Sequence, residues 1–299
     1  MTIQPDITTP LVRDPIQQPN EDIGLLTYLQ GTWNSPKGAE ATGFNVMPLP
    51  QAGATGGYIL KNFPYYEEIT FAPIAGGAPN RGGTFTQNNN LLFYEQRVFI
   101  ANNPAPANAN SPQDTLIHAE NGAWLYRSIV PQLNGPYGPD NLQPSGPLPV
   151  QPASRQYVKQ TSVPHGNSLL LVGQAIESQG SPQFPQSDRK VLPFTDPTVK
   201  DPNTVLAEQL QGLADSGITV EQYIRFDLST DSAIGGGISN VLFAQHHASV
   251  SSLKTTWYVE FLSNGSIQLQ YTQTIGMNLL INGIMTPFLH VDANTLTKA

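Results

Sequence analysis

Apolar and polar positions alternate along most of this chain, which is the pattern of β-strands. The alternation is clearest at residues 267–275, where Ile267 and Leu269 alternate with Gln side chains. A second alternating run, 256–262, is joined to it by Ser-Asn-Gly-Ser, and a central Asn-Gly favours a tight β-hairpin. The two runs predict an antiparallel pair of strands with one apolar and one polar face.

Similar runs predict strands along the rest of the chain. A second Asn-Gly, at residues 121–122, predicts another hairpin that joins 116–120 to 123–127. Further strands are expected at 42–48, 57–62, 65–74, 91–100, 156–163, 168–177, 221–229, 238–249 and 284–291. So many strands favour an all-β, antiparallel architecture, and closing the sheet into a barrel would remove its exposed edges.

Only two helices are expected, and both are short. The first has Asn20 as its N-cap, a leucine-rich face and Gly31 as its stop signal. The second has Asp201 as N-cap, Pro202 at the first helical position and Gly217 beyond its end.

Proline-rich segments set the domain organisation. Residues 1–19 carry regularly spaced prolines without an apolar period and predict an extended N-terminal arm. The segment from 20 to 299 is expected to form a single elaborated β-barrel domain. Three long Pro-rich loops interrupt it, at 101–113, 131–153 and 179–203. Loops of this length are usually lids, binding loops or disordered inserts.

Composition narrows the classes of function. The chain has 14 Lys+Arg and 22 Asp+Glu, a net charge of -8, and its Asn and Gln residues outnumber its charged ones. Few charges argue against long solvated helices, and the acidic balance argues against nucleic-acid binding. The absence of Cys excludes disulfides and thiolate metal sites. With no secretory signal and no apolar run long enough to span a membrane, a cytoplasmic protein is expected.

Four segments resemble the nitrobindin-like, haem-binding barrels of the calycin type. They are 29–33 (Leu-Gln-Gly-Thr-Trp), 66–71 (Tyr-Glu-Glu-Ile-Thr-Phe), 117–122 (Ile-His-Ala-Glu-Asn-Gly) and 287–291 (Pro-Phe-Leu-His-Val). The first resembles the calycin opening, in which a short helix closes one end and Gly-x-Trp starts a strand. The resemblance implies a calycin-like β-barrel whose interior binds one hydrophobic small molecule, either haem or a lipophilic metabolite. The middle of the chain, roughly 130–250, is longer than in a compact nitrobindin.

The resemblance also implies where a haem iron would be held. The family's proximal His stands in a Pro-His-Leu context in the last strand, and Phe288 occupies that position here. His290 lies two residues further, on the same strand face and about 6.6 Å away. Either His290 is the metal ligand in a shifted geometry, or the protein kept the barrel and binds no cofactor. Phe288, His165 and Trp33 are the other residues expected to line the cofactor site.

The other four histidines lie in a predicted hairpin, a turn and a predicted strand. His118 is expected to point away from the apolar face of its hairpin, and His165 lies in a turn that could aim it into a barrel mouth. His246 and His247 are adjacent in an expected strand, so they face opposite sides and one of them faces the interior. No His pair has zinc-ligand spacing, which argues against a zinc site.

Charged residues within strands are the candidates for catalysis. Glu95 and Arg97 share one strand face, and if that face is the interior they could act as an acid/base pair. If it is the outer face, they form an ordinary solvated pair. The same question applies to Glu67, Glu260 and the pair Arg225 and Asp227.

Three functions therefore stay open. The leading one is a barrel that binds a small hydrophobic ligand. The alternative is a cofactor-independent isomerase, cyclase or hydrolase for an apolar substrate, with Glu95, Arg97, His165 and Tyr94 as candidate catalytic residues. Outward projection of Glu95 would end that alternative. The third is a structural module whose loops bind a protein partner, and a homodimer is compatible with each of the three.

Overall fold

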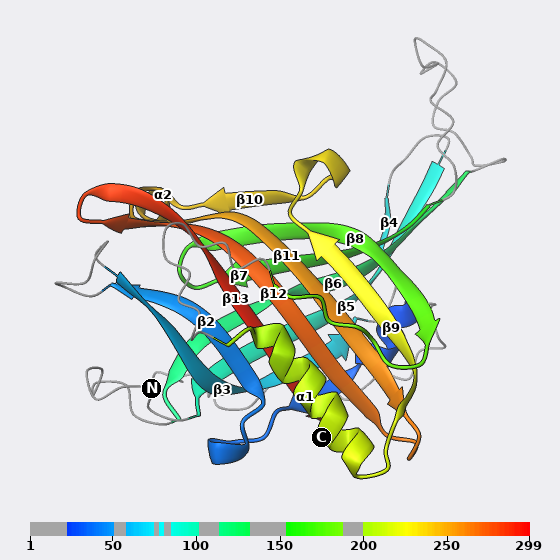
Figure 1. Ribbon diagram of the computed structural model, residues 1–299. Coiled ribbons are helices and arrows are strands. Elements are labelled where there is room, and N and C mark those ends of the chain that lie inside the picture. The colour runs from blue at the N-terminus through cyan, green and yellow to red at the C-terminus, as the bar shows by residue number, and fades with distance from the viewer. Residues whose placement is uncertain are drawn as a thin grey trace, which may run out of the picture.

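A computed structural model describes residues 23–50, 58–74, 78–80, 85–101, 114–131, 154–187 and 200–299 (Figure 1). The predicted N-terminal arm and the interiors of the three predicted loops lie outside these residues.

The described strands form one antiparallel sheet that closes on itself. They are β1 (Gly31–Asn34), β2 (Gly43–Pro50), β3 (Tyr58–Pro73), β4 (Ala78–Asn80), β5 (Phe85–Ile100), β6 (Leu116–Pro131), β7 (Ser154–Val163), β8 (Asn167–Gln179), β9 (Val220–Ser229), β10 (Gly237–Asn240), β11 (Ala248–Leu262), β12 (Ile267–Ile281) and β13 (Ile284–Lys298). The order β3-β2-β13-β12-β11-β9-β8-β7-β6-β5 returns to β3 through the β3–β5 pairing, so ten of the described strands make a closed barrel. The predicted all-β, antiparallel barrel is confirmed.

Helices are few and short. α1 (Pro202–Asp215) begins as predicted, because the Asp201 side chain accepts a hydrogen bond from the Asn203 backbone N–H and Pro202 occupies the first turn. The first predicted helix is a 3-10 helix, η1 (Gly24–Leu29). The other short helices are η2 (Gly38–Glu40), η5 (Ser232–Ile234) and α2 (Leu242–His247). Among the described residues, no helix is long and apolar enough to cross a membrane.

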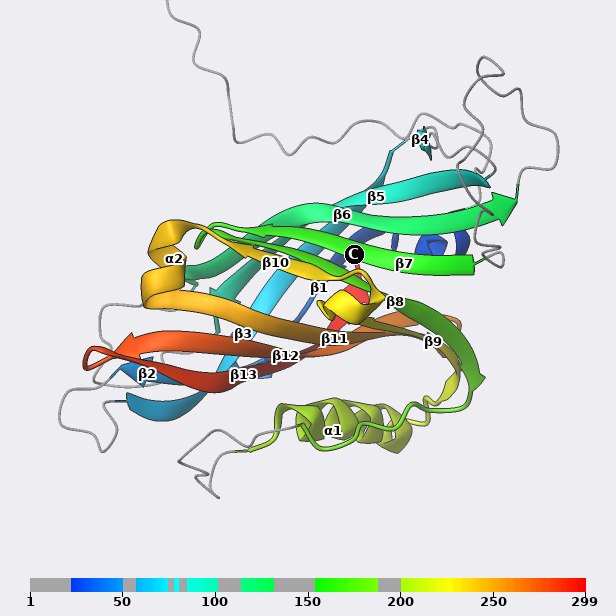
Figure 2. The same ribbon diagram turned by 90° about the horizontal axis from the view of Figure 1, so that it is seen from above.

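The two ends of the barrel differ. At one end, η1 buries Leu26 and Leu29 against the core, and the Trp33 indole donates a hydrogen bond to the Leu29 carbonyl. At the other, which we name the α2 end, α2 lies beside the β12–β13 turn (Figures 1 and 2). The β7–β8 turn adjoins α2, since the Val241 backbone N–H donates to the Gly166 carbonyl.

The outer wall is covered on one side by α1. The predicted Asn264-Gly265 hairpin and the inward direction of Leu269 are both confirmed. Gln268 and Gln270 do face outward, but both are buried instead of coating the surface. The Gln270 side chain donates to the Leu206 carbonyl of α1, so the outer polar stripe is what docks the helix.

The hairpin predicted at Asn121-Gly122 is wrong. Residues 116–131 form one continuous strand, β6, in which Gly122 pairs with Thr161 of β7. A Cβ at Gly122 would lie 1.8 Å from the Gln160 carbonyl oxygen. Glycine at this position therefore allows β6 and β7 to approach closely and does not form a turn.

The strand predicted at 238–249 is also wrong. It divides into β10, α2 and the start of β11, and His246 and His247 lie in the last turn of α2. Both are exposed, so neither faces the interior. The alternation of polar and apolar residues there is too short to separate a strand from a single helical turn.

Candidate functional site

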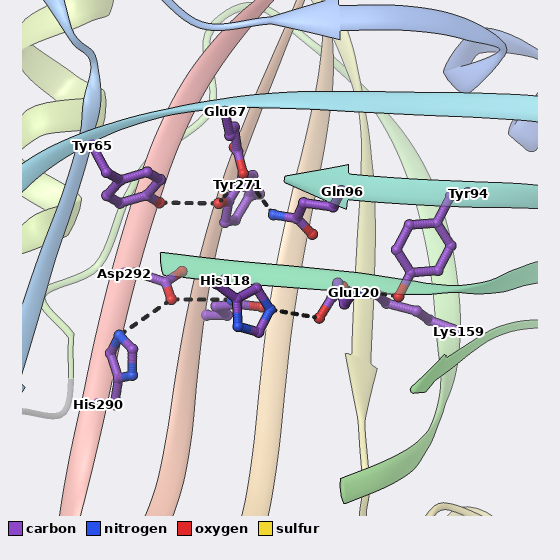
Figure 3. Close-up of polar contacts among 11 residues, drawn as sticks. Tyr65, Glu67, Tyr94, Gln96, His118, Glu120, Lys159, Tyr271, His290 and Asp292 are labelled. Atoms are coloured by element: carbon purple, nitrogen blue, oxygen red, sulfur yellow. Dashed lines mark hydrogen bonds and ion pairs between the residues drawn. The ribbon is translucent and has the colours of Figure 1, made fainter. Parts of the chain in front are cut away.

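A cluster of polar side chains lies on the inner faces of the barrel strands (Figure 3). The strand register places it between the aromatic core and the α2 end. We name it the inner polar cluster. Its members are Tyr65, Glu67, Tyr94, Gln96, His118, Glu120, Lys159, Tyr271, Gln273, His290 and Asp292. Strand alternation carries these side chains inward, because each lies on the face that also bears the buried core residues.

Glu67 is the hub of one part of the cluster. Its carboxyl accepts hydrogen bonds from Gln96 at 2.6 Å, Asn294 at 2.8 Å and the Tyr271 hydroxyl at 3.0 Å. Burial raises the pKa of Glu67 to about 7, and the three donors keep it from rising further. The Tyr65 hydroxyl lies 3.0 Å from that of Tyr271, which extends the network toward β13.

Glu120 and Lys159 form a buried ion pair. The Lys159 ammonium donates to Glu120 at 2.8 Å, and the Tyr94 hydroxyl donates to the same carboxylate oxygen at 2.8 Å. Burial alone would raise the pKa of Glu120, but Lys159 and His118 outweigh it and hold the pKa below its ordinary value. The ammonium also lies 5.5 Å from the centre of the Trp257 ring, a favourable cation–π position.

His118 connects this pair to the α2 end. Its Nε2 lies 3.4 Å from Glu120, and its ring lies 5.9 Å from that of His165, which sits in the β7–β8 turn. The side chain of His118 is 31% exposed, whereas Glu120 is buried. Burial lowers the pKa of His118, but the hydrogen bond to Glu120 and the charges of Glu120 and Asp292 raise it above the ordinary value. His118 therefore faces inward, contrary to the prediction.

His290 and Asp292 are neighbours on the inner face of β13. The Nε2 atom of His290 lies 3.5 Å from Oδ2 of Asp292, which also accepts a hydrogen bond from Gln273. Burial and the charge of His118 lower the pKa of His290 to about 4, so its imidazole is neutral. Burial raises the pKa of Asp292 to about 7.

Some buried polar atoms inside the barrel have no hydrogen-bond partner among the described residues. They include Nε2 of His290, Oδ1 of Asp292 and the indole nitrogens of Trp124 and Trp257. The two indole rings lie 5.3 Å apart between their centres, and Lys159 pairs directly with Trp124 across β6 and β7. Unpaired buried polar atoms are costly, so a water or a ligand group is the natural partner for them.

The residues expected to line a cofactor site lie in three separate places. Phe288 and His290 lie on the inner face of β13, as their spacing predicts, and Phe288 is buried. His165 is exposed in its turn beside His118. Trp33 is fully buried in the core beneath η1, away from the α2 end, so it serves packing.

Of the candidate catalytic residues, Tyr94 faces inward and the charged pair does not. Glu95 and Arg97 project from the outer face of β5, where they form an exposed ion pair with each other. Glu95 and Arg97 are therefore an ordinary solvated pair on the outer face, the second of the two interpretations. Arg225 and Asp227 form a similar exposed pair on β9.

Glu260 is a different case, because it faces outward and is still fully buried. It lies on the outer face of β11 next to Gln268, which donates a hydrogen bond to it at 2.8 Å. Burial raises the pKa of Glu260 to about 8. This carboxyl lies on the outer side of the sheet and does not belong to the inner polar cluster.

A cavity of about 320 Å³ lies against the outer wall, and Glu120 is the member of the inner polar cluster that contributes to its lining. It is lined by Glu95, Ala119, Glu120, Asn121, Ser162 and Pro164. Most of these residues face outward, so this cavity is a polar surface groove.

Sequence reasoning missed Glu120, Lys159 and Asp292 as site residues. Lys159 lies at an inward position of β7, between Tyr157 and Thr161, and that placement was the available signal. Asp292 follows His290 by two residues in the same strand and could have been found in the same way. In the part of the chain that the structure describes, no group of three or more His, Asp or Glu side chains is arranged to hold a metal ion.

Comparison with known proteins adds little information about the function of this chain. No protein-family model matches the chain, and no curated protein matches it significantly. Among solved structures, it is similar to the crystal structure of Rv2717c from M. tuberculosis, with 14% sequence identity and a TM-score of 0.37 over 92% of this chain and 94% of that chain. A likeness of this degree says nothing of what this chain binds.

Proposed function

We propose that the barrel binds one small, mainly apolar molecule through a single polar group held at His290 and Asp292. The polar group is of the hydroxyl or carboxyl type, which can both donate and accept a hydrogen bond. The fold supports this proposal, because small closed barrels hold a ligand where inward side chains leave room for one.

The unpartnered pair on β13 carries the proposal. Nε2 of His290 and Oδ1 of Asp292 are buried, close together and without a hydrogen-bond partner among the described residues. A neutral imidazole accepts a hydrogen bond, and a carboxyl whose pKa is about 7 can either accept or donate one. A ligand hydroxyl would satisfy both atoms at once.

The surroundings of the pair support an apolar ligand body. The rings of Trp124 and Trp257 pack edge to face in the core, and the Trp257 ring stacks on that of Tyr271, a member of the cluster. The His118 side chain is 31% exposed, so the ligand would enter past it.

Haem is a specific ligand that such a barrel could bind, but the described residues fit it poorly. His290 faces inward with a neutral imidazole, as an axial ligand requires. However, its Nε2 faces the carboxylate of Asp292 at 3.5 Å, and the neighbouring interior holds Glu120 and Lys159 instead of an apolar slot. Haemin titration followed by absorbance tests this, since a Soret band that His290→Ala abolishes would establish haem ligation and overturn our proposal.

Calorimetric titration with 2-naphthol and naphthalene tests the binding of a polar group. A site built to pair a hydroxyl rejects an analogue that lacks it. We expect 2-naphthol to bind in a 1:1 ratio at least about tenfold more tightly than naphthalene. Asp292→Ala and His290→Ala should remove most of this preference, whereas Glu95→Gln, on the outer face of β5, should leave it unchanged.

Two results would contradict the proposal. One is the absence of 1:1 binding for both probes, which would favour a structural module with a filled interior. The other is equal affinity for both probes in the wild type, which would mean that the β13 pair takes no part in recognition.

A further inference from the structure

An exposed apolar surface lies at the α2 end of the barrel. It consists of Val241, Leu242, Phe243, Leu280, Ile284 and Met285, and we name it the apolar tip surface. Leu242 and Phe243 are each 70% exposed and Ile284 is 69% exposed. Exposed apolar groups that gather on one surface mark an interaction site more often than scattered ones do.

Two separate elements form this surface. Leu242 and Phe243 belong to the first turn of α2, and Ile284 and Met285 follow the turn at Asn282 and Gly283, where both turn residues have positive φ. Contacts between α2 and β12 hold the two elements side by side, and both views of the barrel show them at the same end (Figures 1 and 2). The apolar side chains therefore protrude from neighbouring tips instead of lining a groove.

The segments that build the apolar tip surface carry no formal charge. Residues 232–253 and 261–291 contain no Asp, Glu, Lys or Arg, although the chain as a whole has a net charge of -8. Protein interfaces usually surround an apolar centre with a polar rim that includes charged groups. These two segments contribute no charged group to such a rim. A surface without charge matches a partner without net charge.

We propose that the apolar tip surface docks the barrel onto an electrically neutral lipid surface, such as a phosphatidylcholine bilayer. Protruding Leu, Phe, Ile and Met side chains insert at the boundary between headgroups and acyl chains, and the affinity follows the apolar area that they bury there. The net negative charge of the rest of the chain disfavours anionic lipids by repulsion. Docking in this orientation brings the end that carries His118 and His165 toward the lipid.

Co-sedimentation of the full chain with phosphatidylcholine vesicles tests this proposal. We expect binding that is insensitive to salt and weaker when phosphatidylglycerol is added. The double variant Leu242→Ser/Phe243→Ser and the single variant Ile284→Ser should each lower the partition coefficient, the double variant by about tenfold or more. Their folds should persist, because these side chains are largely exposed and the buried Ala244 of α2 is kept.

A matched control variant distinguishes binding through this surface from binding through any exposed apolar side chain. Phe93 projects from the outer face of β5 and is 57% exposed, so Phe93→Ser removes an exposed aromatic ring elsewhere on the barrel. Its vesicle binding should equal that of the wild type. No vesicle binding by the wild type, or equal losses in Phe93→Ser and the tip variants, would overturn the proposal. So would a concentration-dependent dimer that the tip variants abolish, since this surface would then bind a second copy of the chain.

Discussion

The Nε2 atom of His290 lies 3.5 Å from a carboxylate oxygen of Asp292, yet burial leaves this imidazole neutral. The burial cost of a charged imidazole and the charge of His118 together lower the pKa of His290 to about 4. His118, which is bonded to Glu120, has a pKa raised above its ordinary value. We therefore expect nitrogen-15 spectra of the imidazoles to show His290 neutral at about pH 6, where His118 is largely protonated.

The variant Glu120→Gln provides the control for that titration. It removes the carboxylate that stabilises the His118 cation, so the pKa of His118 should fall while His290 stays neutral. A His290 resonance that titrates at the ordinary histidine pKa would contradict the burial described for this side chain.

Glu260→Gln should stabilise the protein at alkaline pH. The folded state keeps a proton on Glu260 up to about pH 8, whereas an unfolded Glu loses it near 4.5. The folded state thus binds more protons between these values, and the stability contributed by this group is complete below 4.5 and is lost as the pH rises to about 8. In denaturant unfolding, the unfolding free energy of the variant relative to that of the wild type should increase over that range, by a few kcal/mol at most. An unchanged difference across the range would show that Glu260 ionises normally.

The Glu120 and Lys159 pair should behave as a unit. Lys159→Met leaves the buried Glu120 carboxylate without its cation, and breaking a buried pair in this way costs about 3 to 5 kcal/mol of unfolding free energy. Adding Glu120→Gln to that variant should recover much of the loss, because the uncompensated charge is then gone. Unfolding of the wild type, the two single variants and the double variant measures the coupling. Additive losses would contradict the close contact between the two side chains.

The barrel could be predicted from the sequence because its signals are local. Alternation placed Leu269 on the inner face, and Asn264-Gly265 marked a hairpin. Asp201 and Pro202 marked the start of α1 in the same way. Each of these signals needs only a few neighbouring residues, and the structure confirms them.

The inner polar cluster could not be predicted because it depends on strand pairing. Gln96 comes within 2.6 Å of Glu67 only because β5 pairs with β3, and Lys159 meets Glu120 only because β7 pairs with β6. Misassigning a turn at residues 121–122 also placed His118 on the wrong face. A one-residue error in a strand inverts every side chain beyond it.

Gly122 provides the sharpest test of the corrected β6 strand. A methyl group at this position would meet the Gln160 carbonyl oxygen at 1.8 Å, so the strands must separate and Gly122→Ala should lose about 1 to 3 kcal/mol or more. Gly212→Ala is the matched control, because no heavy atom lies within 4 Å of a Cβ there and the residue is inside α1. That variant should gain about 0.5 to 1 kcal/mol from the higher helix propensity of alanine. Equal unfolding free energies for the two variants would disprove the close approach of β6 and β7 at Gly122.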